Sequence, residues 1–219
     1  MSAQKIVPIV EGHGEERAVP CLIRRWLRHR RLHQFFEVPD LAINAKGCGN
    51  LKAAYDRERH RGIEHYIEAA LRGRPDAILV IIDADDDCMS RGQGNGLGPE
   101  LLARAREVAS HVPLAVVVAN REYEAWFLAS LTSIRLAGLL PKGTRLPGGP
   151  TDLVPESPRD CKGLIAGLMC CPYEETVHQL ALTRGLTFSP KVKHRSPSYG
   201  KLLKELEQLT RGARRNKNE

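Results

Sequence analysis

The feature that most constrains the fold is an unbroken apolar run, 77–82, that ends in a cluster of four aspartates. A continuous β-branched run of this kind is typical of a strand buried on both faces, and its acidic end then falls where parallel sheets hold their ligands. Asp83 and Asp85 are expected on one side, where a divalent cation with oxygen ligands would offset their repulsion; a solvated turn is the alternative. For Asp86 and Asp87 we expect such a turn.

The composition favours an ordinary globular protein with a basic surface. Of 219 residues, 42% are hydrophobic and 27% are charged. The net charge of +7 suits a basic surface that attracts a polyanion and surrounds a local acidic pocket. Arginines interrupt the first helix-like region, and no apolar run approaches a membrane span, so we expect a cytoplasmic protein with no membrane segment. The six cysteines form no CxxC pair and are expected to be reduced thiols.

Strand-like and helix-like segments alternate through the first part of the chain. Further strands are expected at 5–10, 38–45 and 113–119, and helices at 15–31, 50–72, 100–111 and after residue 120. Pro8 suggests an edge position or a bulge for the first strand, and the glycines of 92–98 suggest a loop beside the acidic site. This alternation predicts an α/β fold: a Rossmann-like, mainly parallel sheet of about four strands flanked by helices.

The alternation stops where 140–158 becomes rich in proline, glycine and threonine. Beyond it, helices are expected at 159–169, 173–183 and 199–210. We therefore expect a metal-binding catalytic domain over 1–140, a helical C-terminal extension over 141–210 and a disordered basic tail over 211–219.

Acidic residues follow three of the expected strands. The pairs are Glu11 with Glu15, Asp83 with Asp85, and Glu122 with Glu124. Because parallel strands place their carboxyl ends at one edge of a sheet, these side chains are expected to converge although they are far apart in sequence. Carboxylates from three strand ends together favour a metal site more than any one pair does.

These motifs resemble the Toprim domain of topoisomerases, primases and the overcoming-lysogenization-defect (OLD) type nucleases. The resemblance is carried by Glu11-Gly12 after the first strand and Asp83-Ala84-Asp85 after a later one. OLD-type nucleases are the closer match, with a second glutamate like Glu15 and a Ser/Glu pair at the place of Glu122-x-Glu124. The layout, including Glu-Ala-Trp at 124–126 and Arg-Ser-Pro-Ser-Tyr at 195–199, also resembles a small bacterial family of stand-alone Toprim-like proteins associated with ATPases in phage defence.

The resemblance implies a nuclease that hydrolyses phosphodiester bonds of DNA or RNA with Mg²⁺ or Mn²⁺. Two such ions would stabilise the attacking and leaving oxygens. The metal ligands implied are Glu11, Asp83 and Asp85 at the core, Glu15 and Glu124 at a second site, and Glu122 in an outer or alternate role. Glu11 would also be the general base.

Other functional residues are suggested less directly. OLD-type nucleases use a lysine beyond the acidic core, and Lys162, at an expected helix start, is the candidate, with Lys191, Lys193 and Lys201 as competitors. Arg195, Ser198 and Lys201 are candidate nucleic-acid contacts. The partners expected are nucleic acid and an ABC- or AAA-type ATPase, for which this chain would be the effector, and a homodimer is compatible with the sequence.

Two other functions stay open. A nucleotide-sugar transferase also places Asp-x-Asp after an apolar strand to hold manganese, but it leaves Glu11, Glu15 and the acids at 122 and 124 unexplained. A non-catalytic subunit that binds an ATPase or nucleic acid would account for the glutamate, Glu122, that stands where OLD-type enzymes have serine.

Overall fold

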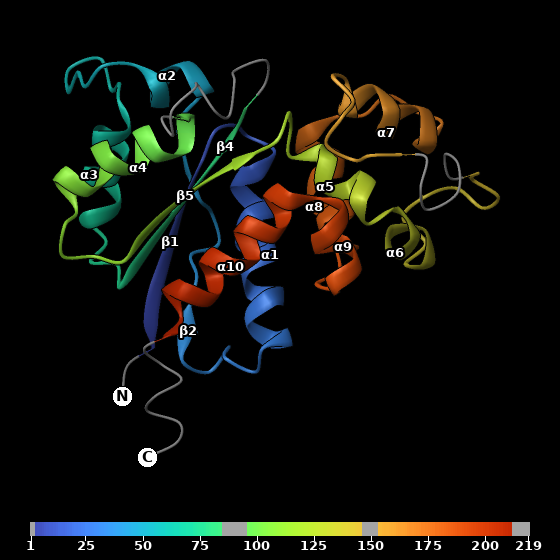
Figure 1. Cartoon of the computed structure of the whole chain (residues 1–219), viewed down its shortest axis with the longest axis horizontal. Coiled ribbons are helices and arrows are strands. Elements are labelled where there is room, and N and C mark those ends of the chain that lie inside the picture. Colours follow the sequence, from blue (N-terminus) through green and yellow to red (C-terminus); the bar gives the residue numbers. More distant parts are fainter. Residues whose placement is uncertain (1–2, 85–95, 146–152, 212–219) are drawn as a thin grey trace.

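The computed structural model describes residues 3–84, 96–145 and 153–211. A five-stranded parallel sheet lies between two layers of helices (Figure 1). This confirms the predicted α/β class. The strands are β1 (Gln4–Val10), β2 (Phe36–Glu37), β3 (Ile43–Asn44), β4 (Ala77–Asp83) and β5 (Leu114–Ala119). The single strand expected at 38–45 is replaced by the two short strands β2 and β3.

The sheet order is β2-β1-β4-β5, with β3 also pairing β1, so β1 lies inside the sheet. The edge position expected for its proline is therefore wrong, but the position is unusual. β2 pairs with Gln4 and Lys5, β3 pairs with Ile9 and Val10, and Pro8 lies between these two stretches. The missing N–H of proline thus falls opposite the gap between the two short partners.

Side chains alternate between two apolar layers along the three long strands. Leu79 and Ile81 of β4 face one layer, whereas Val80 and Ile82 face the other. Every residue of β4 is buried, as expected for a strand covered on both sides. The uninterrupted apolar run that predicted this strand therefore reflects helices on both faces of the sheet.

Helices follow the predicted alternation with one large exception. The helix expected over 50–72 is divided into α2 (Cys48–Lys52) and α3 (Ile63–Leu71). Between them the chain turns back through a bridge between Asp56 and Arg61, and Gly62 has a φ of 88°, which a helix cannot accommodate.

The other helices are α1 (Glu15–His29), α4 (Leu97–Val108), α5 (Glu124–Ala129), α6 (Leu131–Leu136), α7 (Cys161–Met169), the π-helix η1 (Glu175–Gln179), α8 (Leu180–Thr183), α9 (Pro190–Arg195) and α10 (Pro197–Leu209). α9 was not expected from the sequence.

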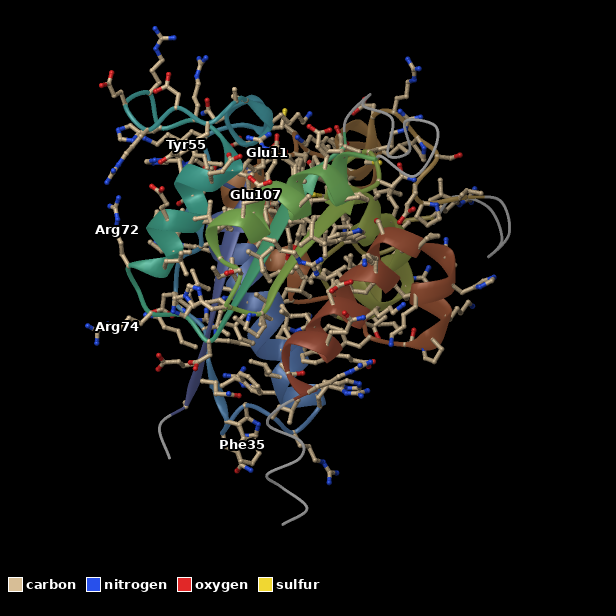
Figure 2. The ribbon with its side chains drawn as sticks, turned by 60° about the vertical axis from the view of Figure 1, so that its left-hand side comes forward. Glu11, Phe35, Tyr55, Arg72, Arg74 and Glu107 are labelled. Atoms are coloured by element: carbon tan, nitrogen blue, oxygen red, sulfur yellow. The ribbon has the colours of Figure 1, made fainter. Side chains whose placement is uncertain are left out.

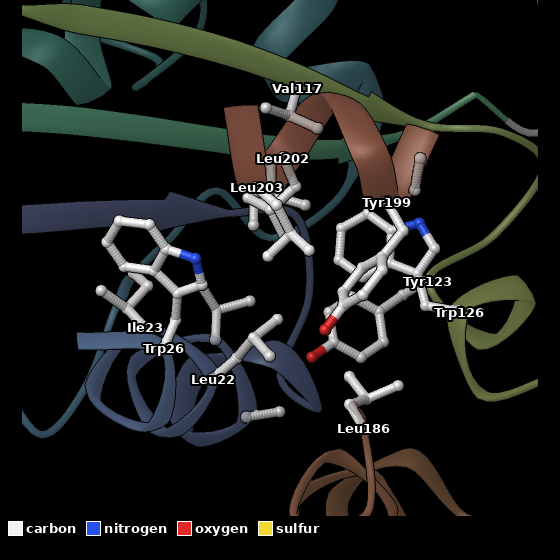
Figure 3. Close-up of a cluster of buried hydrophobic side chains, with 14 of the residues drawn as sticks. Leu22, Ile23, Trp26, Val117, Tyr123, Trp126, Leu186, Tyr199, Leu202 and Leu203 are labelled. Atoms are coloured by element: carbon white, nitrogen blue, oxygen red, sulfur yellow. The ribbon is translucent and has the colours of Figure 1, made fainter. Parts of the chain in front are cut away.

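The C-terminal helices share a core with the sheet. Figure 3 shows Leu202 and Leu203 of α10 between Val117 of β5 and the side chains of α1, with Tyr199 beside Trp126. The ring centroids of Trp126 and Tyr199 are 5.5 Å apart. The predicted extension is thus built around the same hydrophobic core as the sheet.

The sheet places its carboxyl ends at one end of the molecule. Figure 2 shows Glu11, at the end of β1, near the end of the molecule where Tyr55 lies, and Phe35 at the opposite end. Among the described residues, no helix is long and apolar enough to cross a membrane.

Candidate functional site

The first acidic motif is tied directly to the end of β4. The backbone N–H of Asp83 donates to Oε2 of Glu11 at 3.0 Å, which joins the ends of neighbouring strands through a side chain. Glu15, in the first turn of α1, accepts from the backbone N–H of Gly12 at 2.8 Å. Gly12 thus lies in a turn that closes on Glu15, and the two strand ends hold their carboxylates side by side, as the sequence predicted.

Glu124, the first residue of α5, is completely buried. Its Oε1 accepts from the Tyr173 hydroxyl at 2.7 Å and from Nε2 of Gln179 at 3.2 Å. Its Oε2 is also buried and has no hydrogen-bond partner. Buried carboxylate oxygens normally have a donor or a cation, so this atom is where a further donor or a cation would bind.

The acids from the three strand ends lie close enough to affect one another's pKa values. Burial raises the pKa of Glu15 to about 7, and the charges of Glu11 and Glu124 add to the rise. Burial also raises the pKa of Asp83 well above its usual value, again with a contribution from Glu15, Glu124 and Glu11. The pKa of Glu124 is raised to about 7, chiefly by burial. A divalent cation would relieve this repulsion.

Lys162, the second residue of α7, brings a positive charge to the acidic group. Its Nζ forms an ion pair with Oε1 of Glu175 at 2.5 Å. Burial opposes its charge, but the hydrogen bond that it donates to Glu175 and the charge of Glu124 hold the pKa of Lys162 above its usual value. Lys162 in turn moderates the pKa of both Asp83 and Glu124. The structure therefore brings the predicted lysine to the predicted carboxylates.

Glu122 has a different position from its neighbours. Its Oε2 accepts from the backbone N–H groups of Cys161 and Lys162 at 3.0 and 3.2 Å. A carboxylate at the start of α7 interacts favourably with the N–H groups that have no partner inside the helix. Glu122 therefore holds the helix that carries Lys162, which agrees with an outer role at the site.

The described residues fit a hard divalent cation in part. Within 3–84, 96–145 and 153–211, no three His, Cys, Asp or Glu side chains stand together in metal-ligand geometry. The predicted ligand Asp85 lies outside the described residues, as do Asp86, Asp87 and most of the glycine-rich loop. The unpartnered oxygen of Glu124, beside Asp83 and Glu15, is the observation that a cation would explain.

Of the suggested nucleic-acid contacts, two have structural roles. Ser198 is buried and donates to Glu156 at 2.6 Å, while accepting from the indole N–H of Trp126 at 2.9 Å. Arg195 donates to the carbonyl oxygens of Ala129 and Leu153. Lys201 is exposed and pairs with Glu205. The hydroxyl of Ser198 is thus buried and already bonded to Glu156 and Trp126.

Three residues of the site were missed in the sequence: Tyr173, Glu175 and Gln179. They come from the C-terminal helical part, where no local motif signals a site. Gly14 is the one indirect signal, because a Cβ there would lie 2.3 Å from Oε1 of Gln179 and 2.8 Å from Cβ of Glu175. The glycine lets η1 approach the start of α1.

The fold and this acidic edge define a class: a parallel α/β protein with a carboxylate-rich candidate site at the carboxyl ends of its strands. Residues 10–207 match the profile of a family described as a domain of unknown function (DUF4276), and the chain belongs to this family. Comparisons with curated proteins and with solved structures gave no match.

Proposed function

We propose that the protein is a divalent-metal-dependent nuclease that hydrolyses phosphodiester bonds of DNA or RNA. The observation that carries the proposal is the buried Oε2 of Glu124, which has no partner and lies among carboxylates from two other strand ends. A purely structural glutamate at this place would be expected to have donors for both oxygens. The resemblance to OLD-type nucleases supports the same function.

Glu11, Asp83 and Asp85, with Glu15 and Glu124, would hold Mg²⁺ or Mn²⁺ in this proposal. Two such ions would lower the pKa of an attacking water and would stabilise the negative charge on the leaving oxygen. Glu11, which accepts a hydrogen bond from the N–H of Asp83, would accept the proton of the water. Lys162 provides a positive charge beside the carboxylates, where the negative charge of a phosphate would enter.

The experiment is a cleavage assay on single- and double-stranded DNA and RNA with Mg²⁺ or Mn²⁺. Wild type is compared with Asp83→Asn, Glu11→Gln and the matched control Glu107→Gln, an exposed acid on α4 away from the site. We expect cleavage by wild type and the control, and a loss of about 100-fold or more in the two site variants. Undiminished cleavage by Asp83→Asn would overturn the assignment.

The resemblance to ATPase-associated proteins gives the assay a second arm. We propose that the chain acts as the effector of an ATPase-linked anti-phage system, so the same substrates are tested with the ATPase of its own system and ATP. Binding of Mn²⁺ measured by calorimetry, with no cleavage in either arm, would favour the non-catalytic alternative. Hydrolysis of a nucleotide-sugar donor would favour the transferase.

A further inference from the structure

A cavity of about 440 Å³ lies beside β5, between the starts of α4 and α10. These two helices lie on either side of the strand (Figure 1). The cavity is lined by Val116 and Val118 of β5, by Leu102 of α4, and by one proline from the first turn of each helix. Its size and mainly apolar lining are typical of sites for small ligands.

One end of the cavity carries a buried carboxylate. Glu156 is 9% exposed, and its Oε1 accepts from the Ser196 hydroxyl at 2.5 Å and from the N–H and hydroxyl of Ser198 at 2.8 and 2.6 Å. Its Oε2 accepts one hydrogen bond, from Nδ2 of Asn120 at 3.2 Å. Among the described residues, no lysine, arginine or histidine pairs with this carboxylate.

Two neighbouring acceptors are therefore left at the cavity. One is Oε2 of Glu156, which has room for a further donor, and the other is Oδ1 of Asn120, to which no described residue donates. Both residues line the cavity. A ligand that fits has two adjacent N–H donors and a body that packs against the mainly apolar lining. Lys201 lines the cavity wall and pairs with Glu205, but its side chain is exposed and can also contact a negative group on the same ligand.

We propose that this cavity binds the guanine base of a nucleotide. Guanine has adjacent N–H donors on its Watson–Crick edge, on N1 and on the exocyclic N2. On the same edge of adenine, cytosine and uracil, each donor lies next to an acceptor. This proposal rests on the proposed nuclease function. Asn120 directly follows β5 and lies two positions before Glu122, so the cavity adjoins the acidic edge. A base held here lies next to the acidic edge, where it would select the phosphodiester bond that is cut.

An arginine side chain of a partner protein also offers paired N–H donors. The structure favours the nucleotide, because a guanidinium group would leave most of the cavity unfilled. Lys201, which is exposed and pairs with Glu205, could also contact the phosphate of a nucleotide, whereas an arginine side chain offers it no negative group.

The test is calorimetric titration of the whole chain in EDTA with GMP, IMP, AMP and CMP. We expect GMP to bind about tenfold or more tightly than AMP and CMP, and IMP, which lacks the N2 amino group, to be intermediate. Leu102→Trp should abolish binding by filling the cavity, and Lys201→Ala should weaken it about threefold. The matched controls are Leu168→Trp, a partly buried leucine on α7, and Lys204→Ala, an exposed lysine of α10 that does not line the cavity; both should bind as wild type does.

Leu102→Trp leaves the hydrogen bonds of Glu156 in place, so it tests the cavity without removing the buried carboxylate. Equal affinity for the four nucleotides, no binding of GMP, or tighter binding of N-acetylarginine amide than of GMP would each overturn the base site. Asp83→Asn separates this proposal from the nuclease: it should keep GMP binding while losing cleavage. GMP selectivity without cleavage of any nucleic acid refutes the nuclease alone, and cleavage with no GMP selectivity refutes the base site alone.

Discussion

Glu124 and Glu156 are both buried carboxylates, but their surroundings differ. Glu156 accepts four hydrogen bonds from Asn120, Ser196 and Ser198. Glu124 accepts two, has one oxygen with no partner, and lies close enough to Glu15 and Asp83 to raise the pKa of each. The carboxylate of Glu156 is satisfied by four donors, whereas burial opposes the charge of Glu124, and Lys162 and Tyr173 offset only part of that effect.

This difference separates two uses of a buried acid. The donors of Glu156 come from the start of α10 and the end of β5, so its carboxylate holds the loop at 153–158 to the core. The acids around Glu124 keep a local excess of negative charge at the edge of the sheet. Such an excess persists in a folded protein when a cation compensates for it.

The largest expected effect is on cleavage. Glu124→Gln keeps the shape of the side chain but removes its charge, so we expect a loss of about 100- to 1000-fold in the rate of cleavage with Mg²⁺. Circular dichroism and thermal unfolding would show that the variant is folded. A rate within twofold of that of Glu107→Gln would remove Glu124 from the site.

The next effect is on stability at the other carboxylate. Glu156→Ala leaves the N–H of Ser198 and two serine hydroxyls without their acceptor, and we expect the free energy of unfolding to fall by about 2–3 kcal/mol. Urea denaturation measures this change. A loss below about 0.5 kcal/mol would mean that water replaces the carboxylate, which would weaken the contrast with Glu124.

The acidic edge should also make stability depend on pH in the metal-free protein. Glu15 and Glu124 have a pKa of about 7 in the folded state against 4.5 in an unfolded chain, so the folded state binds more protons between these values. The contribution of these two groups to the free energy of unfolding is therefore greatest below about pH 4.5. It falls as the pH rises to about 7, by up to about 1.4 kcal/mol per pH unit for each carboxylate.

Urea midpoints measured in EDTA from pH 5 to 8 test this slope, and Mn²⁺ should restore stability more at pH 8 than at pH 5. Glu15→Gln should flatten the profile, because it removes one of the two groups. A profile that is unchanged in Glu15→Gln would show that repulsion at the edge does not control stability.

The smallest effect concerns Glu124 without metal. At pH 8 in EDTA, Glu124→Gln removes a charge that burial disfavours, so we expect it to stabilise the protein by about 1 kcal/mol while it lowers cleavage. Glu156→Gln under the same conditions should destabilise it by a similar amount, because an amide NH₂ would face donors. If both variants changed the free energy of unfolding in the same direction, the distinction between the two acids would be contradicted.

The sheet was predictable because its three long strands are apolar runs that end at charged or polar residues. β4 and β5 were expected within about a residue of their bounds, and the acids after β1 and β4 follow from the parallel order. The division between α2 and α3 was not predictable from periodicity, because the charged residues between them match a solvated helix face as well as a loop. The backbone at Gly62 decides between the two.

The partners of Glu124 could not be predicted, for a different reason. Tyr173 and Gln179 reach the site through tertiary packing of the C-terminal helices, and their local sequence resembles an ordinary amphipathic segment. Lys162 was one of several candidate lysines, and its ion pair with Glu175 distinguishes it only in three dimensions. The intramolecular hydrogen bonds of Ser198 and Arg195 could not be predicted, because their acceptors lie far away in sequence.

The shared core has a consequence for how the site is made during synthesis. Every predicted metal ligand precedes residue 125, but the groups that orient Glu124 and bring a lysine to it lie between 162 and 179. A ribosome delivers the acidic residues first and their supporting groups later. A nascent or prematurely terminated chain that ends before residue 162 therefore carries all the acids without the architecture that arranges them, so the site is assembled only after most of the chain has been translated.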